Sequence, residues 1–250
     1  MLKLAGFIVG TIVGSFLGVC IDRMPRGESV VAPGSHCSKC GAQLGALELI
    51  PVIGYVLLWG RCRHCGERVP IWYPLLEVGC GLLYAGVLGK YGFTLSAVNA
   101  LISISLAVVA AGIDLGHRVI PDRLTMPWMI AGLLMGALSG GLQGILSRAL
   151  GLLACGGLVL LIAVLSRGGM GGGDIKFMAL VGSFLGFLGG LTSFVVAFII
   201  GALVGVILIV LGIKSRKDEI PFGPFISVGT IIVCIFGDRI IPLVFPWIRL

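Results

Sequence analysis

The sequence predicts an all-α polytopic membrane protein of about eight transmembrane helices, with one small polar domain between the first and second spans. Of its 250 residues, 58% are hydrophobic and 12% are charged, and the mean hydropathy is +1.12. A soluble domain of this length could not bury so much apolar surface. Apolar stretches of about 20 residues, the length that crosses a bilayer, recur along the chain and are separated by short charged segments.

The predicted spans define the organisation of the chain. The first apolar stretch, Leu4 to Ile21, is longer than a signal-peptide core and is followed by no small-residue cleavage site, so we expect a retained span. A first transmembrane helix over 1–22, a polar domain over 23–73 and a membrane core of about seven helices over 74–250 are predicted. The spans are 4–22, 74–89, 94–113, 124–140, 145–165, 175–190, 192–213 and 224–245.

Basic residues are concentrated on one side of the predicted membrane, which places that side in the cytoplasm and both termini outside. The net charge of +7 therefore reflects orientation in the membrane and does not predict a nucleic-acid partner. The four connections predicted to be cytoplasmic hold 13 of the 18 Lys and Arg residues: Arg23, Arg26, Lys39, Arg61, Arg63, Arg68, Arg118, Arg123, Arg167, Lys176, Lys214, Arg216 and Lys217. The opposite side holds Lys3, Lys90, Arg148, Arg239 and Arg249.

Two Cys-x2-Cys motifs in the polar domain predict a metal site. Cys37 and Cys40 form the first motif, Cys62 and Cys65 form the second, and 21 residues separate the two. Each turn can direct two thiolates at one tetrahedral ion, so the four cysteines complete the ligand set of a structural Zn²⁺, and the pattern resembles a zinc ribbon. A domain of roughly 50 residues buries too little apolar surface to be stable without such a metal site or another cross-link. Two disulfides or a redox-active pair are the alternatives, and a cytoplasmic location favours zinc.

Two aspartates adjoin predicted spans. Asp114 ends a long apolar helix, and Asp174 follows the glycine-rich run 168–173 and opens the next apolar helix. An ionisable group there is costly unless it meets water, a partner or a function. On one side of the membrane, two carboxylates sharing a water could act as general base and general acid, as in aspartyl proteases. The alternatives are a helix cap for Asp174 and a local ion pair of Asp114 with His117 or Arg118.

Four further acidic residues are candidates for supporting roles. Asp122 could cap the span that begins near Leu124. Asp22, Glu48 and Glu77 are candidates for substrate binding or for supporting the aspartates, with local ion pairs as the alternative.

A series of short motifs runs along almost the whole chain, and their order and spacing together are specific. In these motifs the chain resembles the bacterial type IV prepilin leader peptidases, which are also N-methyltransferases. The motifs are Gly14-Ser15-Phe16-Leu17, Arg23-Met24-Pro25-Arg26-Gly27-Glu28-Ser29, Ser35-His36-Cys37-Ser38-Lys39-Cys40-Gly41, Ile50-Pro51-Val52-Ile53-Gly54-Tyr55, Arg61-Cys62-Arg63-His64-Cys65-Gly66, Tyr73-Pro74-Leu75-Leu76-Glu77, Ile113-Asp114, Ile120-Pro121-Asp122, the Gly171-Gly172-Gly173-Asp174 form of the GxGD signature, and Ile220-Pro221-Phe222-Gly223-Pro224.

The resemblance implies a multi-pass protein of the bacterial cytoplasmic (inner) membrane whose partners are membrane lipid and a type IV prepilin or type II secretion pseudopilin. It implies cleavage on the cytoplasmic side, after the glycine that ends a short basic leader. Methylation of the new amino terminus by S-adenosylmethionine would follow. The implied catalytic pair is Asp114 and Asp174, and the implied zinc ligands are Cys37, Cys40, Cys62 and Cys65.

Two other functions are compatible with the residues alone. The first is a small transporter or channel that uses Asp114 and Asp174 as ion or proton sites. The second is a membrane thiol oxidoreductase that cycles the Cys-x2-Cys pairs, which requires them to face outward. The sequence contains no feature that predicts an oligomeric state.

Overall fold

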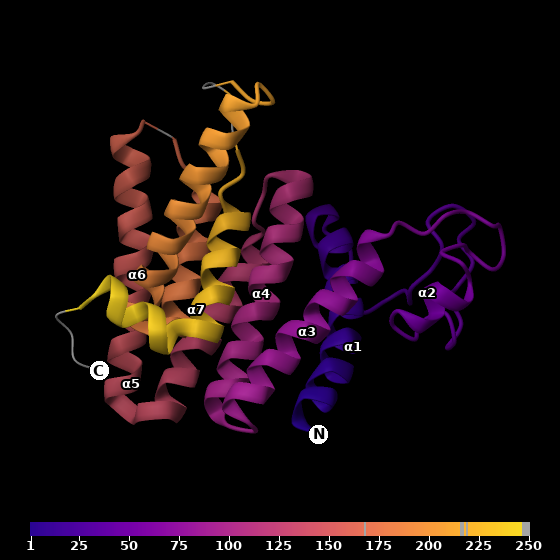
Figure 1. Ribbon diagram of the computed structural model, residues 1–250, viewed down its shortest axis with the longest axis horizontal. Coiled ribbons are helices and arrows are strands. Elements are labelled where there is room, and N and C mark those ends of the chain that lie inside the picture. The colour runs from indigo at the N-terminus through magenta and orange to yellow at the C-terminus, as the bar shows by residue number, and fades with distance from the viewer. Residues whose placement is uncertain (168, 216–217, 219, 247–250) are drawn as a thin grey trace. The chain divides into compact units, whose positions relative to one another are not determined.

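The computed structural model describes residues 1–167, 169–215, 218 and 220–246, and within them it is helical, with isolated β-bridges and no strand (Figure 1). The all-α class is therefore confirmed for the described part of the chain. Gly168 of the glycine-rich run, and Arg216, Lys217 and Arg249 of the charge pattern, lie outside the described residues. The chain forms two compact units, Met1–Ala97 and Val98–Leu250, called here the amino-terminal and carboxyl-terminal units.

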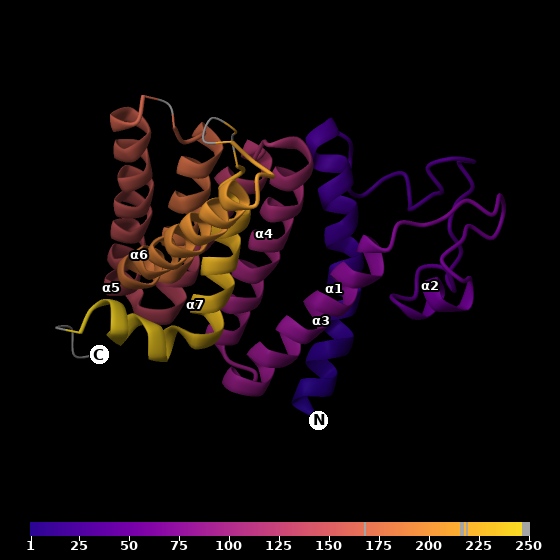
Figure 2. The same ribbon diagram turned by 45° about the horizontal axis from the view of Figure 1, so that its top comes forward.

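The amino-terminal unit pairs two long helices and carries a polar loop between them. It contains α1 (Leu2–Arg23), the short 3₁₀ helix η1 (Met24–Arg26), α2 (Ile53–Leu57) and α3 (Trp72–Tyr91). Helices α1 and α3 cross at close range, as Figure 2 shows, because glycines of α1 face the backbone of α3. A Cβ on Gly10 would lie 2.6 Å from the carbonyl oxygen of Cys80, and one on Gly14 would lie 2.9 Å from the Cα of Glu77. Larger residues would separate the helices.

The carboxyl-terminal unit contains most of α4 (Leu95–His117), together with α5 (Asp122–Leu165), α6 (Gly172–Val210) and α7 (Gly223–Val244). Helix α5 is a hairpin of two arms, which Figure 1 shows turning back on itself. Its backbone leaves the helical region at Gly140 and Gly141. Residues eight positions apart in a straight helix are separated by about 12 Å, yet a Cβ on Gly136 would lie 2.8 Å from the carbonyl oxygen of Gly144.

Helix α6 folds back in the same way, at Gly186. This residue has a φ of 70°, a conformation that favours glycine. A Cβ on Gly190 would lie 3.1 Å from the Cα of Gly182, which brings the two arms together. Arg148 of α5 supports the break, because its guanidinium donates to the Asn99 side chain at 2.8 Å and to the carbonyl oxygen of Phe184. From the sequence, Arg148 was predicted only as one of the basic residues on the outer side of the membrane.

Within the part of the chain that the structure describes, five helices are long and apolar enough to cross a membrane, namely α1 extended through η1, α4, α5, α6 and α7. The predicted spans 124–140 and 145–165 correspond to the two arms of α5. The spans 175–190 and 192–213 correspond to the arms of α6, although the break lies at Gly186 and not after residue 190. Helix α3, which covers the predicted span 74–89, is not among the five. A multi-pass helical protein is therefore supported, and the count of eight crossings stays a prediction.

Candidate active site and metal centre

Three helix ends of the carboxyl-terminal unit meet at Asp114. The residue lies three positions before the end of α4, and it is 6% exposed. Its Oδ2 accepts a hydrogen bond of 3.0 Å from the backbone N–H of Gly223, the first residue of α7. A Cβ at position 223 would lie 2.6 Å from the same oxygen, so glycine is required for this contact. The sequence motif around Gly223 did not predict this role for the glycine.

Asp174 joins the same cluster from the start of α6. It is the third residue of this helix, and its Oδ2 accepts a hydrogen bond of 3.2 Å from the N–H of Gly171, the N-cap. The capping alternative therefore describes part of its geometry. Capping does not explain why Asp174 also lies close enough to Asp114 for the two carboxyl groups to interact electrostatically. The two aspartates, 60 positions apart in sequence, thus belong to one polar cluster.

The connection between α4 and α5 packs against the start of α6. A Cβ on Gly173 would lie 3.2 Å from the Cβ of Ile120, and the ammonium of Lys176 lies 2.6 Å from Oδ1 of Asp122. The expected capping role of Asp122 is wrong, because Pro121 is the N-cap of α5 and no side chain caps it. Asp122 is exposed and pairs with Lys176 instead. This ion pair was not predicted from the sequence, although Lys176 lies only two positions after Asp174.

The local alternative for Asp114 is correct only in part. The charge of Arg118 acts on the Asp114 carboxyl, but that carboxyl accepts a hydrogen bond from Gly223, 109 positions away. The Asp114 side chain is buried, whereas Asp174 is half-buried beside the exposed residues Gly171 and Gly172. Neighbouring carboxyls in unlike environments can divide the roles of acid and base between them.

In the amino-terminal unit the four predicted ligands form one cluster. The Sγ atoms of Cys37, Cys40, Cys62 and Cys65 all lie within 4.8 Å of one another. The Cys37 and Cys65 sulfurs are 3.8 Å apart, and those of Cys40 and Cys62 are 4.0 Å apart. A tetrahedral Zn²⁺ with bonds of about 2.3 Å requires sulfur atoms about 3.8 Å apart. A disulfide requires about 2.05 Å, and the four thiols are free. The donor set therefore fits a metal ion such as zinc.

Each pair of cysteines is held by a tight turn. The N–H of Gly41 donates to the carbonyl oxygen of Cys37 at 2.9 Å, and the N–H of Cys37 donates to Ala42 at 2.9 Å. The second turn repeats this pattern over Cys62 to Glu67. Gly41 and Gly66 close the turns with φ of 70° and 71°, where a side chain would be strained. The glycine after each motif thus shapes the ligand turn.

The metal-free thiols differ in acidity. The backbone N–H groups of Cys40 and Lys39 lower the pKa of the Cys37 thiol to about 6. The N–H of Glu67 acts to lower the pKa of Cys65, but desolvation and the other three sulfurs raise it to about 12. Lys39 and Glu67 form an ion pair between the two turns. A cation that binds all four sulfurs displaces the protons that they carry, because the thiolate is the metal ligand.

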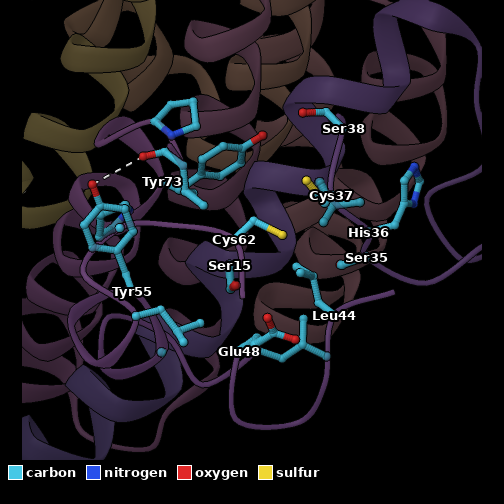
Figure 3. A pocket seen from close by; sticks show the side chains of 18 of the residues that line it. Ser15, Ser35, His36, Cys37, Ser38, Leu44, Glu48, Tyr55, Cys62 and Tyr73 are labelled. Carbon is cyan, nitrogen blue, oxygen red and sulfur yellow. Dashed lines mark hydrogen bonds between the residues drawn. The ribbon is translucent and has the colours of Figure 1, made fainter. Parts of the chain in front are cut away.

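The remaining candidate carboxyls surround a cavity of about 330 Å³ in the amino-terminal unit (Figure 3). Asp22, Glu48 and Glu77 all line it. Asp22 accepts a hydrogen bond from the Tyr73 hydroxyl, and Oε2 of Glu77 accepts one of 2.7 Å from the N–H of Val52. The structure thus groups these three residues with one another, within a single compact unit.

Comparison with known proteins gives a consistent result over most of the chain. Residues 8–91 match a family model described as the bacterial peptidase A24 N-terminal domain, and residues 101–206 match the type IV leader peptidase family. A Bacillus subtilis protein described as prepilin leader peptidase/N-methyltransferase is 34% identical over 238 residues, 94% of each chain.

Proteins with the same description from two other bacteria have a similar sequence identity to this chain. The Myxococcus xanthus protein is 36% identical over 214 residues, 81% of this chain and 62% of that one. The Pseudomonas putida protein is 31% identical over 266 residues, 93% of this chain and 90% of that one. No solved structure matches the chain.

Proposed function

Because the chain belongs to the type IV leader peptidase family, as its sequence motifs predicted, we propose that it removes the short basic leader from type IV prepilins or type II secretion pseudopilins. The bacterial relatives and the five long apolar helices support a multi-pass inner-membrane enzyme. The charge distribution supports cleavage on the cytoplasmic side. The names of the relatives support a second activity, N-methylation of the new amino terminus with S-adenosylmethionine.

One observation carries the peptidase proposal: the cluster in which Asp114, Asp174 and Gly223 meet from three helix ends. Residues this distant in sequence come together only through the tertiary fold, and the meeting places two carboxyls within electrostatic reach. In the proposed reaction one carboxylate takes a proton from water, the water oxygen attacks the scissile carbonyl carbon, and the other carboxyl protonates the leaving nitrogen. The acid and base are not assigned to individual residues, because a coupled pair titrates as a unit.

The start of α6 is suited to hold an extended substrate beside these carboxyls. Gly171 and Gly172 are exposed and have no side chains, so a peptide backbone could approach closely. The N-terminal N–H groups of a helix also favour negative charge, such as the oxyanion formed during hydrolysis. The four cysteines would hold a structural Zn²⁺ that keeps the polar loop of the amino-terminal unit folded.

The decisive experiment is leader removal from a purified prepilin by the purified protein in lipid. We expect Asp114→Asn and Asp174→Asn each to reduce the cleavage rate by about 10³-fold or more, the upper range for loss of an acid–base group. Asp122→Asn is the matched control, since it removes an exposed carboxyl from the same cluster, and it should retain the rate within about threefold. Wild-type rates in either of the first two variants would refute the assignment.

The two rival functions are not favoured. A transporter would need Asp114 and Asp174 as ion sites, and a thiol oxidoreductase would need disulfides, whereas the sulfur separations fit a metal. The same preparations distinguish them, since neither rival would release a leader peptide from a prepilin.

A further inference from the structure

The polar loop of the amino-terminal unit carries an exposed apolar surface that the proposed reaction does not use. Between residues 45 and 60 only Glu48 is charged. Large apolar side chains of this segment are at least 55% exposed and are called here the α2 face: Leu47, Ile53, Val56, Leu57 and Trp59. A contiguous apolar surface of this kind marks a site that another molecule or a membrane covers.

Helix α2 has a second face that is turned inward. Gly54, Tyr55 and Leu58 line the cavity of the amino-terminal unit, where Figure 3 shows Tyr55, whereas no member of the α2 face lines it. A Cβ on Gly54 would lie 2.7 Å from the carbonyl oxygen of Leu47, so the preceding segment packs directly on the helix. The α2 face is therefore the outer side of a packed element.

The turn that ends α2 exposes the largest member of this face. The N–H of Gly60 donates to the carbonyl oxygen of Tyr55 at 2.8 Å, and the N–H of Arg61 donates to that of Leu58 at 3.0 Å. Between them Trp59 has a φ of 53° and is 89% exposed. A residue with a side chain adopts this conformation only where the surrounding structure imposes it. The turn therefore holds the indole in its outward position.

The charges that follow the α2 face are positive. Arg61 and Arg63 come directly after Trp59 and Gly60, and both are exposed. The acidic residues of the same part of the loop are directed elsewhere, because Glu48 lines the cavity and Glu67 forms an ion pair with a lysine. An apolar helix face bordered by tryptophan and arginine is typical of a segment that lies in a membrane interface, where anionic headgroups attract the arginines.

A bilayer surface lies within reach of this face. The chain leaves α1, which is long and apolar enough to cross a membrane, at Arg23 and enters α3 at Trp72. Figures 1 and 2 both show α2 to the side of these helices, at a level between the two ends of α1. Ile71, Leu75 and Leu82 are exposed and share one face of α3 and its N-cap, so an apolar stripe on α3 continues to the end of the loop.

We propose that the α2 face inserts into the interface of the bilayer and that Arg61 and Arg63 contact anionic phospholipid headgroups, so that the polar loop is docked on the membrane. Charge favours lipid over two other occupants. A second copy of the chain would bring the same arginines against each other in a two-fold interface. A prepilin would bring a basic leader to the same arginines. Anionic lipid alone among the three brings the opposite charge.

The test measures whether acyl chains reach Trp59 in the full-length protein, held in nanodiscs of phosphatidylcholine and phosphatidylglycerol. The protein has four tryptophans, so the emission of Trp59 is taken as the difference between the wild type and Trp59→Phe. Lipids brominated on the acyl chains should quench this emission by about twofold or more, because the indole lies at the level of the headgroups and upper chains. Nanodiscs of phosphatidylcholine alone should give clearly weaker quenching, since the arginines then lack an anionic partner.

Val56→Lys places a charge on the α2 face and should reduce the quenching of Trp59, with zinc content reporting that the loop is still folded. Val31→Lys is the matched control, because Val31 is an exposed valine of the same loop outside the α2 face, and it should be quenched as the wild type is. Wild-type Trp59 that is unquenched by brominated lipid would overturn the proposal, whatever the variants do. Equal quenching with and without phosphatidylglycerol would overturn the role of the arginines.

Two further outcomes would assign the α2 face to another occupant and so also overturn the proposal. The first is protection of Trp59 from an aqueous quencher only after a prepilin is added. The second is protection only in nanodiscs that hold two copies of the chain. Leader removal is measured separately, so the proposed function stands or fails independently of where α2 lies.

Discussion

The two compact units hold their polar groups in different ways. In the amino-terminal unit, side chains do the holding: four thiols gather at one point, and carboxyls and arginines surround one cavity. In the carboxyl-terminal unit, backbone contacts between glycines pack α5 against α6, and two carboxyls lie where the ends of α4, α6 and α7 converge. The amino-terminal unit therefore depends on its bound metal, whereas the carboxyl-terminal unit depends on close helix packing. Different substitutions should accordingly disrupt the two units.

Loss of the metal should have the largest effect, and only on the amino-terminal unit. Cys62→Ser removes one of four ligands, and the metal contributes about 10 kcal/mol to the folding of small zinc domains. We expect zinc to fall from about one ion per chain to none, with rapid tryptic cleavage between residues 27 and 71 and little loss of helical circular dichroism. Cys20→Ala, which removes a buried thiol outside the cluster, should keep the metal. Oxidation of the thiols of the two Cys-x2-Cys motifs in the purified wild type would contradict the prediction.

A change at the meeting point of helix ends should impair chemistry and leave the metal in place. Gly223→Ala would put a Cβ 2.6 Å from Oδ2 of Asp114 and displace the carboxyl. Misplacement by about 1 Å costs roughly 10²-fold in rate, and we expect that loss in leader removal, with normal zinc content. Gly157→Ala, at a position of α5 with open space around it, should cleave as the wild type does. Equal rates for the two variants would show that the contact of Gly223 with Asp114 does not position the carboxyl.

Packing between α5 and α6 should be sensitive to a single methyl group. In Gly182→Ala the new Cβ would lie 2.9 Å from the backbone nitrogen of Leu152, and against the backbone of Gly151. Such overpacking costs about 1–3 kcal/mol, which should appear as a lower midpoint of unfolding in mixed detergent micelles. Gly157→Ala again serves as the control. A stability equal to that of the control would mean that α5 and α6 can move apart at this contact without a loss of stability.

The smallest effect is expected at the ion pair beside the aspartates. Lys176→Gln breaks the contact with Asp122, but the side chains are 39% and 59% exposed, and exposed pairs contribute about 0–1 kcal/mol. We expect less than a threefold change in the rate of leader removal. A loss approaching that of Asp174→Asn would move Lys176 from the surface of the cluster into its chemistry.

Features formed by residues close together in the chain were predictable from the sequence. The turns around Cys37 and Cys62 were predicted with their ligands, because two cysteines separated by two residues form a metal turn by local geometry alone. Features that depend on residues far apart in the chain were predicted less accurately. The break of α6 at Gly186 depends on Asn99 and Arg148, which no local pattern connects to it. Asp122 was expected to cap α5, but the fold brought Lys176 within reach.

The amino-acid sequence was sufficient to predict the membrane character of the chain, its family, the four cysteines of the metal site and the two aspartates that are costly in lipid. Each of these follows from composition, spacing or motif order, which are properties of the chain before it folds. Three features came only from the tertiary structure: Gly223 donates to Asp114, the break of α6 lies at Gly186, and Asp22, Glu48 and Glu77 surround one cavity. The physical reason is that these contacts join residues up to 109 positions apart, and only helix packing sets which of them meet.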